Sequence, residues 1–197
     1  MSDKPLPLFP LRTVLFPQGP LPLRVFEPRY LDMVSNCMKS DSEFGVVLIL
    51  EGTEVGEARL VSVGTRARIT DWYQGSDGIL GITAVGSAKF QVGEVERQDD
   101  GLYIANVTDL PPEPSIPLPT EYQPMASLLE AIIDDLGKLY EPVEKRYDDA
   151  GWVGLRFSEI LPMELEQKQA CLEMEDPIER LASMRPLLRS IRAERPQ

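Results

Sequence analysis

Residues 6–31 read LPLFPLRTVLFPQGPLPLRVFEPRYL, and this stretch decides the fold. Five prolines interrupt the apolar run before Arg24, so the stretch is not a helix, although its leucine, valine and phenylalanine content is typical of a buried core. We predict two short strands joined in a hairpin by a tight turn at residues 17–20. A helix then begins at Pro28, since the first helical position tolerates proline.

A charged cluster lies where the predicted strand becomes the predicted helix. Arg24, Glu27 and Arg29 bracket this junction, and Glu27 faces the positive end of the helix dipole and two guanidinium groups. Because every charge has a neighbour of opposite sign, we interpret the cluster as a structural junction. A binding site for an acidic group is the alternative.

The following residues predict most of a sheet. Apolar residues recur at helical spacing over residues 28–39, the run FGVVLIL at 44–50 is typical of a strand covered on both faces, and residues 58–70 alternate like one strand with a wet face. Asp-Gly pairs at 77–78 and 100–101 are flanked by strand-like runs and predict hairpin turns.

Three parts follow from this pattern. Residues 1–110 are expected to form an α+β barrel-like domain with about six strands and one early helix. Residues 111–119 are rich in proline and predict a stiff linker. Residues 120–197 are expected to form a helical subdomain.

Three helices are predicted in that subdomain. The first begins at a capping box formed by Thr120 and Gln123, and Pro142 ends it. The second covers residues 162–174. Asp176 caps the third, with Pro177 as its first helical residue.

Composition excludes several classes of function. The net charge of −12 comes with no basic stripe, so nucleic acid is a poor partner. No apolar run approaches the roughly 20 residues of a membrane span. The two cysteines, Cys37 and Cys171, lie on apolar helical faces and predict buried, reduced thiols in a cytoplasmic protein. Histidine is absent, which removes Ser-His and Cys-His nucleophile pairs and most zinc and iron sites.

We therefore expect no catalytic residue, no metal site and no cofactor. The phosphate-binding pattern G-x-x-x-x-G-K-[ST] does not occur. Trp72 and Tyr73, beside the first predicted hairpin turn, are the candidate binding residues, because large aromatics anchor interfaces. A small satellite core around the two rings is the alternative.

The opening string closely resembles the start of the substrate-binding domain at the N-terminus of Lon proteases, with its "LFP" step and "L-x-V-F-E-x-R-Y" pattern. Residues 64–69, 86–92 and 169–173 are similar to later motifs of that family. The resemblance implies a pseudo-barrel related to the PUA-like fold followed by a helical bundle. It further implies a stand-alone bacterial form without the ATPase and peptidase domains of complete Lon proteases.

Three hypotheses follow. The first is a non-catalytic module that recognises unfolded or partly folded polypeptides, alone or with a protease or chaperone partner. The second is a nucleic-acid-binding PUA-like protein, which requires a basic patch that includes Arg59, Arg66 and Arg68 on one face. The third is a minimal hydrolase, for which the nearest serine and lysine pair is Ser87 and Lys89. No predicted turn or helix end supplies an oxyanion hole there.

Overall fold

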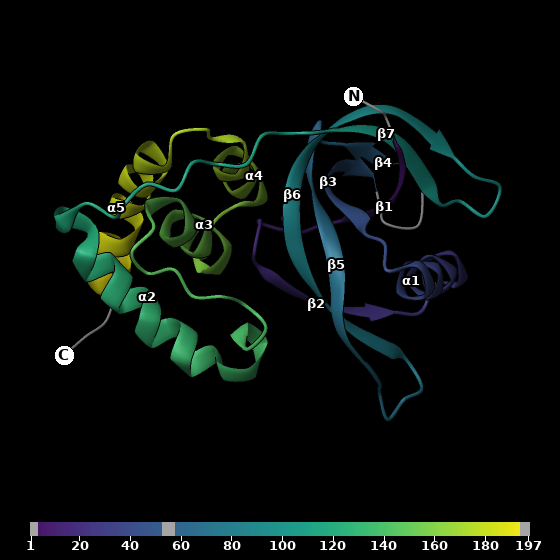
Figure 1. Ribbon diagram of the computed structural model, residues 1–197, viewed down its shortest axis with the longest axis horizontal. Helices are drawn as coiled ribbons and strands as arrows, with labels where there is room; N and C mark the ends of the chain where they lie inside the picture. The colour runs from purple at the N-terminus through teal and green to yellow at the C-terminus, as the bar shows by residue number, and fades with distance from the viewer. Residues whose placement is uncertain (1–3, 53–57, 194–197) are drawn as a thin grey trace. The chain divides into compact units, whose positions relative to one another are not determined.

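Two units make up the chain in the computed structural model, which describes residues 4–52 and 58–193 (Figure 1). The first unit comprises residues 1–112 together with 139–143, and the second comprises residues 113–138 together with 144–197. The sheet and the early helix belong to the first unit. The remaining α-helices belong to the second.

Seven strands form one sheet in the first unit. They are β1 (Lys4–Leu11), β2 (Pro20–Val25), β3 (Phe44–Gly52), β4 (Ala58–Leu60), β5 (Val63–Gln74), β6 (Leu80–Arg97) and β7 (Tyr103–Asp109), with helix α1 (Pro28–Ser40) between β2 and β3. The sheet order is β1-β7-β6-β5-β3-β4, and β1 also pairs with β3. Five strands therefore close into a barrel, while β2 is attached to β6 and β4 to β3.

Strand β1 closes the barrel although it is rich in proline. Its first half pairs antiparallel with β7 and its second half pairs parallel with β3, the two registers meeting at Leu8. Because each half pairs mainly on one side, a proline can turn its nitrogen, which lacks a hydrogen, toward the unpaired side. Leu6 and Leu8, which alternate with the prolines of β1, point into the core.

The prediction that the two N-terminal strands form a hairpin is wrong. Strand β1 pairs with β3 and β7, whereas β2 pairs with β6. The tight turn itself is present, because Gly19 N–H donates to the Phe16 carbonyl at 3.0 Å and Gln18 has a φ of 59°. Two hydrogen bonds, of 2.7 and 2.9 Å, dock this turn on Gly86 of β6. The turn therefore sends the chain to a new neighbour instead of folding it back on β1.

Both predicted Asp-Gly hairpins are confirmed. Gly78 and Gly101 have φ angles of 81° and 86°, which favour glycine. In each turn the aspartate carboxylate accepts a hydrogen bond from the backbone N–H two residues on, at 3.1 Å for Asp77 and 2.9 Å for Asp100. The same short-range chemistry therefore joins β5 to β6 and β6 to β7.

The strand pattern after α1 is confirmed in part. Residues 44–49 of β3 are buried, as expected of a strand covered on both faces. Residues 58–70 are not one strand, because β4 pairs with the far end of β3 while β5 pairs with its beginning. A break at residues 61–62 separates the two.

The helical unit contains α2 (Gln123–Leu136), α3 (Ala150–Ile160), α4 (Leu165–Glu173) and α5 (Pro177–Ala193), with short 3-10 helices η1 (Thr120–Tyr122) and η2 (Gly137–Tyr140) flanking α2. The predicted capping box at Thr120 and Gln123 is wrong, since α2 starts after a 3-10 turn without a side-chain cap. The cap of α5 is confirmed: Asp176 accepts from the Ile178 N–H at 2.8 Å.

Helix α3 is missing from the sequence prediction. Residues 150–158 are all buried, Arg156 and Ser158 included, so its polar residues do not mark a solvent-facing side. Asp149 caps it by accepting a hydrogen bond from the Trp152 N–H at 2.8 Å.

A buried arginine joins the proline-rich segment to the helices of the second unit. The Arg180 guanidinium, fully buried, donates to both carboxylate oxygens of Glu113 at 2.7 and 2.9 Å. It also donates to the carbonyls of Cys171 and Met174 at the end of α4. The segment predicted to be a stiff linker is thus fixed to the helical unit at Glu113.

We expect Gly86→Ala to lower the free energy of unfolding by about 2–3 kcal/mol, because a Cβ there would overlap the Phe16 carbonyl oxygen. Ser87→Ala, at the exposed neighbouring position, is the control and should change little. Urea unfolding of the two variants measures the difference, and equal midpoints would contradict the docking role of Gly86.

We expect Glu113→Gln to destabilise the protein by about 2–3 kcal/mol, because the change leaves the buried Arg180 charge without its carboxylate. Glu121→Gln removes a carboxylate that pairs with Arg185 at the surface, at 3.2 Å, and should cost about 0–1 kcal/mol. Calorimetric unfolding of the two variants measures the loss of stability in each. A larger loss for Glu121→Gln than for Glu113→Gln would be inconsistent with this account.

Candidate functional site

Helix α1 is held against the barrel by its second residue, Arg29. Arg29, 7% exposed, forms an ion pair with Glu27 at 2.7 Å and donates to the Gly101 carbonyl in the β6–β7 turn at 2.9 Å. Its guanidinium carbon lies 4.7 Å from the centre of the Tyr30 ring. One buried cation thus connects the helix start to a turn 72 residues away in sequence.

The predicted charged cluster is divided between two places. Glu27 and Arg29 lie together, and Glu27 occupies the N-cap position without a side-chain cap hydrogen bond. Arg24 instead forms an exposed ion pair with Asp77 in the β5–β6 turn. The Ile79 N–H, together with Arg24, holds the pKa of the Asp77 carboxyl below its usual value.

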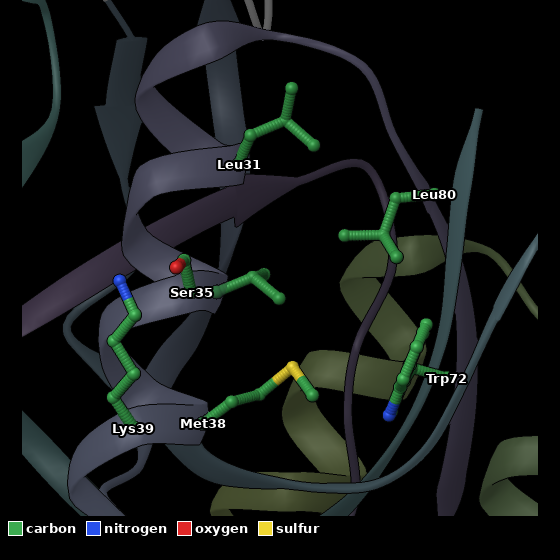
Figure 2. Close-up of a pocket in the computed structure, with 7 residues that line it drawn as sticks. Leu31, Ser35, Met38, Lys39, Trp72 and Leu80 are labelled. Carbon is green, nitrogen blue, oxygen red and sulfur yellow. The ribbon is translucent and has the colours of Figure 1, made fainter. Parts of the chain in front are cut away.

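One face of α1 fills the core and the next face lines a groove. Tyr30, Met33, Val34 and Cys37 belong to the core cluster. The neighbouring face lies along a pocket of about 310 Å³, which β5 and β6 close from the other side with Trp72 and Leu80. On the α1 side the pocket is lined by Leu31, Val34, Ser35, Met38 and Lys39. Figure 2 shows the Trp72 and Leu80 side chains facing Met38 and Leu31 across this pocket. We call it the α1–β5 groove.

A β-bulge in β5 turns Trp72 toward the groove. Ile69 pairs with Ala84 and Trp72 pairs with Ile82, so two residues of β5, Thr70 and Asp71, oppose the single Thr83 of β6. On a regular strand, residues three positions apart point to opposite faces of the sheet. The extra residue at Thr70 instead puts Ile69 and Trp72 on the same face. The Thr70 hydroxyl donates to the Thr83 carbonyl at 3.1 Å within this bulge.

The two candidate aromatics are therefore separated. Trp72 is 57% exposed and lines the groove. Tyr73 is 54% exposed and points to the opposite face, where its ring lies against Gly81. Met38, 42% exposed, was not among the candidates, although the sequence showed it on the apolar side of the helix. Met38 contributes to the groove only because Trp72 lies opposite it, and the sequence does not show where Trp72 lies.

A polar pocket continues the groove past the end of α1. It also measures about 310 Å³ and shares Met38 and Trp72 with the apolar pocket. Asp41 and Asp71 are exposed on its rim, whereas Cys37 is buried below. Burial raises the pKa of the Cys37 thiol, so the sulfur is protonated at neutral pH and is a poor nucleophile.

Two of the three arginines that a nucleic-acid surface would need have acidic partners. Arg66 pairs with Asp109 at 2.6 Å, and Arg68 lies 3.7 Å from Glu43. Arg59 is exposed on β4. Such pairing neutralises much of the charge that would attract phosphate.

Chemistry-bearing groups are few in the part of the chain that the structure describes. Over residues 4–52 and 58–193, no set of three or more acidic or cysteine side chains is placed to hold a metal ion. Ser87 is exposed whereas Lys89 is buried. Nor does any described helix have the length and apolar character required to cross a bilayer.

Solved structures identify the architecture. The crystal structure of a Lon N-terminal domain protein from Xanthomonas campestris superposes with a TM-score of 0.75 at 36% identity, covering 92% of this chain and 96% of that one. The N-terminal domain of the Mycobacterium avium complex Lon protease gives a TM-score of 0.61 at 18% identity, which supports the fold alone. The predicted α+β pseudo-barrel with an early helix and C-terminal helices is confirmed, and the fold is that of a Lon N-terminal domain.

Sequence comparison then gives the family. The substrate-binding domain of ATP-dependent protease La (LON) matches residues 5–190, and the chain belongs to this family. Among curated proteins, cereblon from Gallus gallus is 32% identical over 114 residues, which are 56% of this chain and 25% of that protein. Lon protease 2 from Myxococcus xanthus is 32% identical over 96 residues, or 47% of this chain and 12% of that protein. The chain thus matches about an eighth to a quarter of the length of these relatives.

We expect Glu27→Gln to lower the free energy of unfolding by about 1–3 kcal/mol, because Arg29 is buried and loses its charged partner. Asp77→Asn is the matched control: it removes the charge from the exposed Arg24 pair and should produce a smaller change. Thermal unfolding measures both. An unchanged midpoint accompanied by lost ligand binding would instead make this junction a binding site.

Proposed function

We propose that this protein is a non-catalytic module that recognises unfolded or partly folded polypeptides through the α1–β5 groove. The observation that carries the proposal is the exposure of Trp72 and Met38 on the two sides of one apolar pocket. Large apolar side chains left in water on a folded surface cost free energy that a bound apolar segment recovers. Trp72 is the anchor that interface energetics would favour.

Several properties of the groove suit a polypeptide better than a small metabolite. Its wall is mainly aliphatic and aromatic, and it opens into a polar pocket with carboxylates on the rim. A flexible methionine such as Met38 adapts to different apolar side chains. The site therefore favours binding a class of sequences over binding one rigid ligand.

The sequence supports a binding role without catalysis. It contains no histidine and no phosphate-binding loop, and the Cys37 thiol is buried and protonated. We infer that any polypeptide captured here is processed by a partner, a protease or a chaperone. Matching regions occupy a small part of much longer Lon proteases, which is consistent with a recognition step that precedes another activity.

Nucleic-acid binding is the second candidate, suggested by the resemblance of the barrel to the PUA-like fold. The net charge of −12 and the acidic partners of Arg66 and Arg68 weigh against it. Retention on single-stranded RNA that falls steeply with added salt would favour this candidate instead.

We expect the protein to bind reduced, alkylated lactalbumin with a dissociation constant of roughly micromolar order, and native lactalbumin much more weakly. Trp72→Ala should weaken this binding about tenfold or more, because it removes the apolar anchor. Tyr73→Ala is the matched control, since Tyr73 is equally exposed but points to the opposite face, and it should weaken binding much less than Trp72→Ala. Fluorescence anisotropy of the labelled polypeptide measures each affinity.

Two outcomes would contradict the proposal. The first is a polypeptide affinity that Trp72→Ala does not change. The second is cleavage of the labelled polypeptide, or of casein, by the purified protein with or without ATP, which would make the protein an enzyme.

A further inference from the structure

The α1–β5 groove borders an open strand edge. Strand β5 pairs with β6 over nearly its whole length, but on its other side it pairs with β3 only at residues 65–67. In the described residues no strand pairs with that side over residues 68–74. Seven residues of strand correspond to an edge of about 23 Å. Figure 1 shows this part of β5 extending with β6 away from the barrel as a hairpin.

The two edges of this part of the sheet differ in their proline content. Strand β2, on the far side of β6, carries Pro20 and Pro22 within its six residues. Proline has no amide hydrogen, and prolines on an edge strand discourage another chain from pairing with it. Residues 68–74, RITDWYQ, contain no proline. One edge is thus protected and the other can accept a partner strand.

The open edge and the groove are parts of the same surface. Residues 68–72 of β5 all line the polar pocket, and Trp72 also lines the apolar pocket. A chain that hydrogen-bonds along this edge would therefore direct alternate side chains toward α1. Trp72, Met38 and Leu80 lie where the apolar ones would pack.

Asp71 occupies the edge at the bulge. Its carboxylate accepts a hydrogen bond from the Trp72 N–H at 2.8 Å. Because Asp71 is exposed, a peptide carbonyl could replace it as acceptor, and the released carboxylate would then be available to a basic side chain. Asp41 on the same rim adds a second negative charge, while Arg68 lies near Glu43.

We propose that the polypeptide is bound as an extended strand that adds to the β5 edge at residues 68–74. Its alternate apolar side chains fill the α1–β5 groove, and a basic residue lies near Asp41 and Asp71. This inference rests on the proposed function and specifies the conformation and the chemistry of the substrate. Strand addition draws its affinity from main-chain hydrogen bonds, so it is compatible with many sequences.

The test uses a labelled peptide of about ten residues that alternates valine or phenylalanine with threonine and ends in two lysines. Two further versions carry N-methyl groups on alternate amides, one version on the odd positions and the other on the even positions. Successive amides of a strand point to opposite edges, so only one version loses the donors that face β5. Side chains are identical in all three peptides.

Strand addition predicts that one N-methylated version binds at least about tenfold more weakly than the parent peptide while the other binds about equally. Equal affinity of all three peptides, with binding still dependent on Trp72, overturns strand addition but leaves polypeptide recognition standing. No binding of any peptide or of unfolded lactalbumin overturns both.

A charge exchange at the edge tests the remaining part of the proposal. Asp71→Lys should weaken binding of the lysine peptide and strengthen binding of a version that ends in two glutamates. Asp77→Lys, in the exposed β5–β6 turn, should leave this preference unchanged. Hydrogen exchange should also slow at the amides of residues 68–74 when the parent peptide binds. An unchanged charge preference in Asp71→Lys, or unchanged exchange along β5, would overturn the assignment of the edge.

Discussion

The ion pair between the buried Arg29 and the partly exposed Glu27, at the start of α1, is the constraint on which the candidate site depends. A guanidinium buried this deeply is tolerated because it meets a carboxylate, a carbonyl and an aromatic face at once. Its hydrogen bond to Gly101 ties the helix to the β6–β7 turn, so α1 has a fixed starting point. The α1 wall of the groove is therefore held in place by polar contacts as well as by the apolar core.

Much of the fold could be predicted from the sequence because the signals were local. The helix after Pro28, the Asp-Gly turns and the Asp176 cap each depend on residues within a few positions of one another. Strand pairing depends on distant residues, which is why the docking of the N-terminal turn on Gly86 was not predicted. Helix α3 was missed because residues 150–158 are buried on every side, Arg156 and Ser158 included, so its polar residues do not mark a solvent-facing side.

The site was predictable only in part. Trp72 was singled out as a large aromatic beside a turn, and that reasoning placed Tyr73 with it. The bulge at Thr70 separates the two rings, and a bulge of one residue leaves no clear mark in a single sequence. Closeness in sequence groups the charged residues around Arg24 into one cluster, whereas in the structure Arg24 pairs with Asp77 in a distant turn.

The contact between Arg180 and Glu113 has a practical consequence for dissecting the chain. The helical unit begins seven residues before the first helical turn, at Thr120, because its buried arginine needs an acidic group supplied by the proline-rich segment. An expression fragment cut at the first helix would bury a cation without its counterion. Such a fragment should start upstream of Glu113 if it is to fold independently.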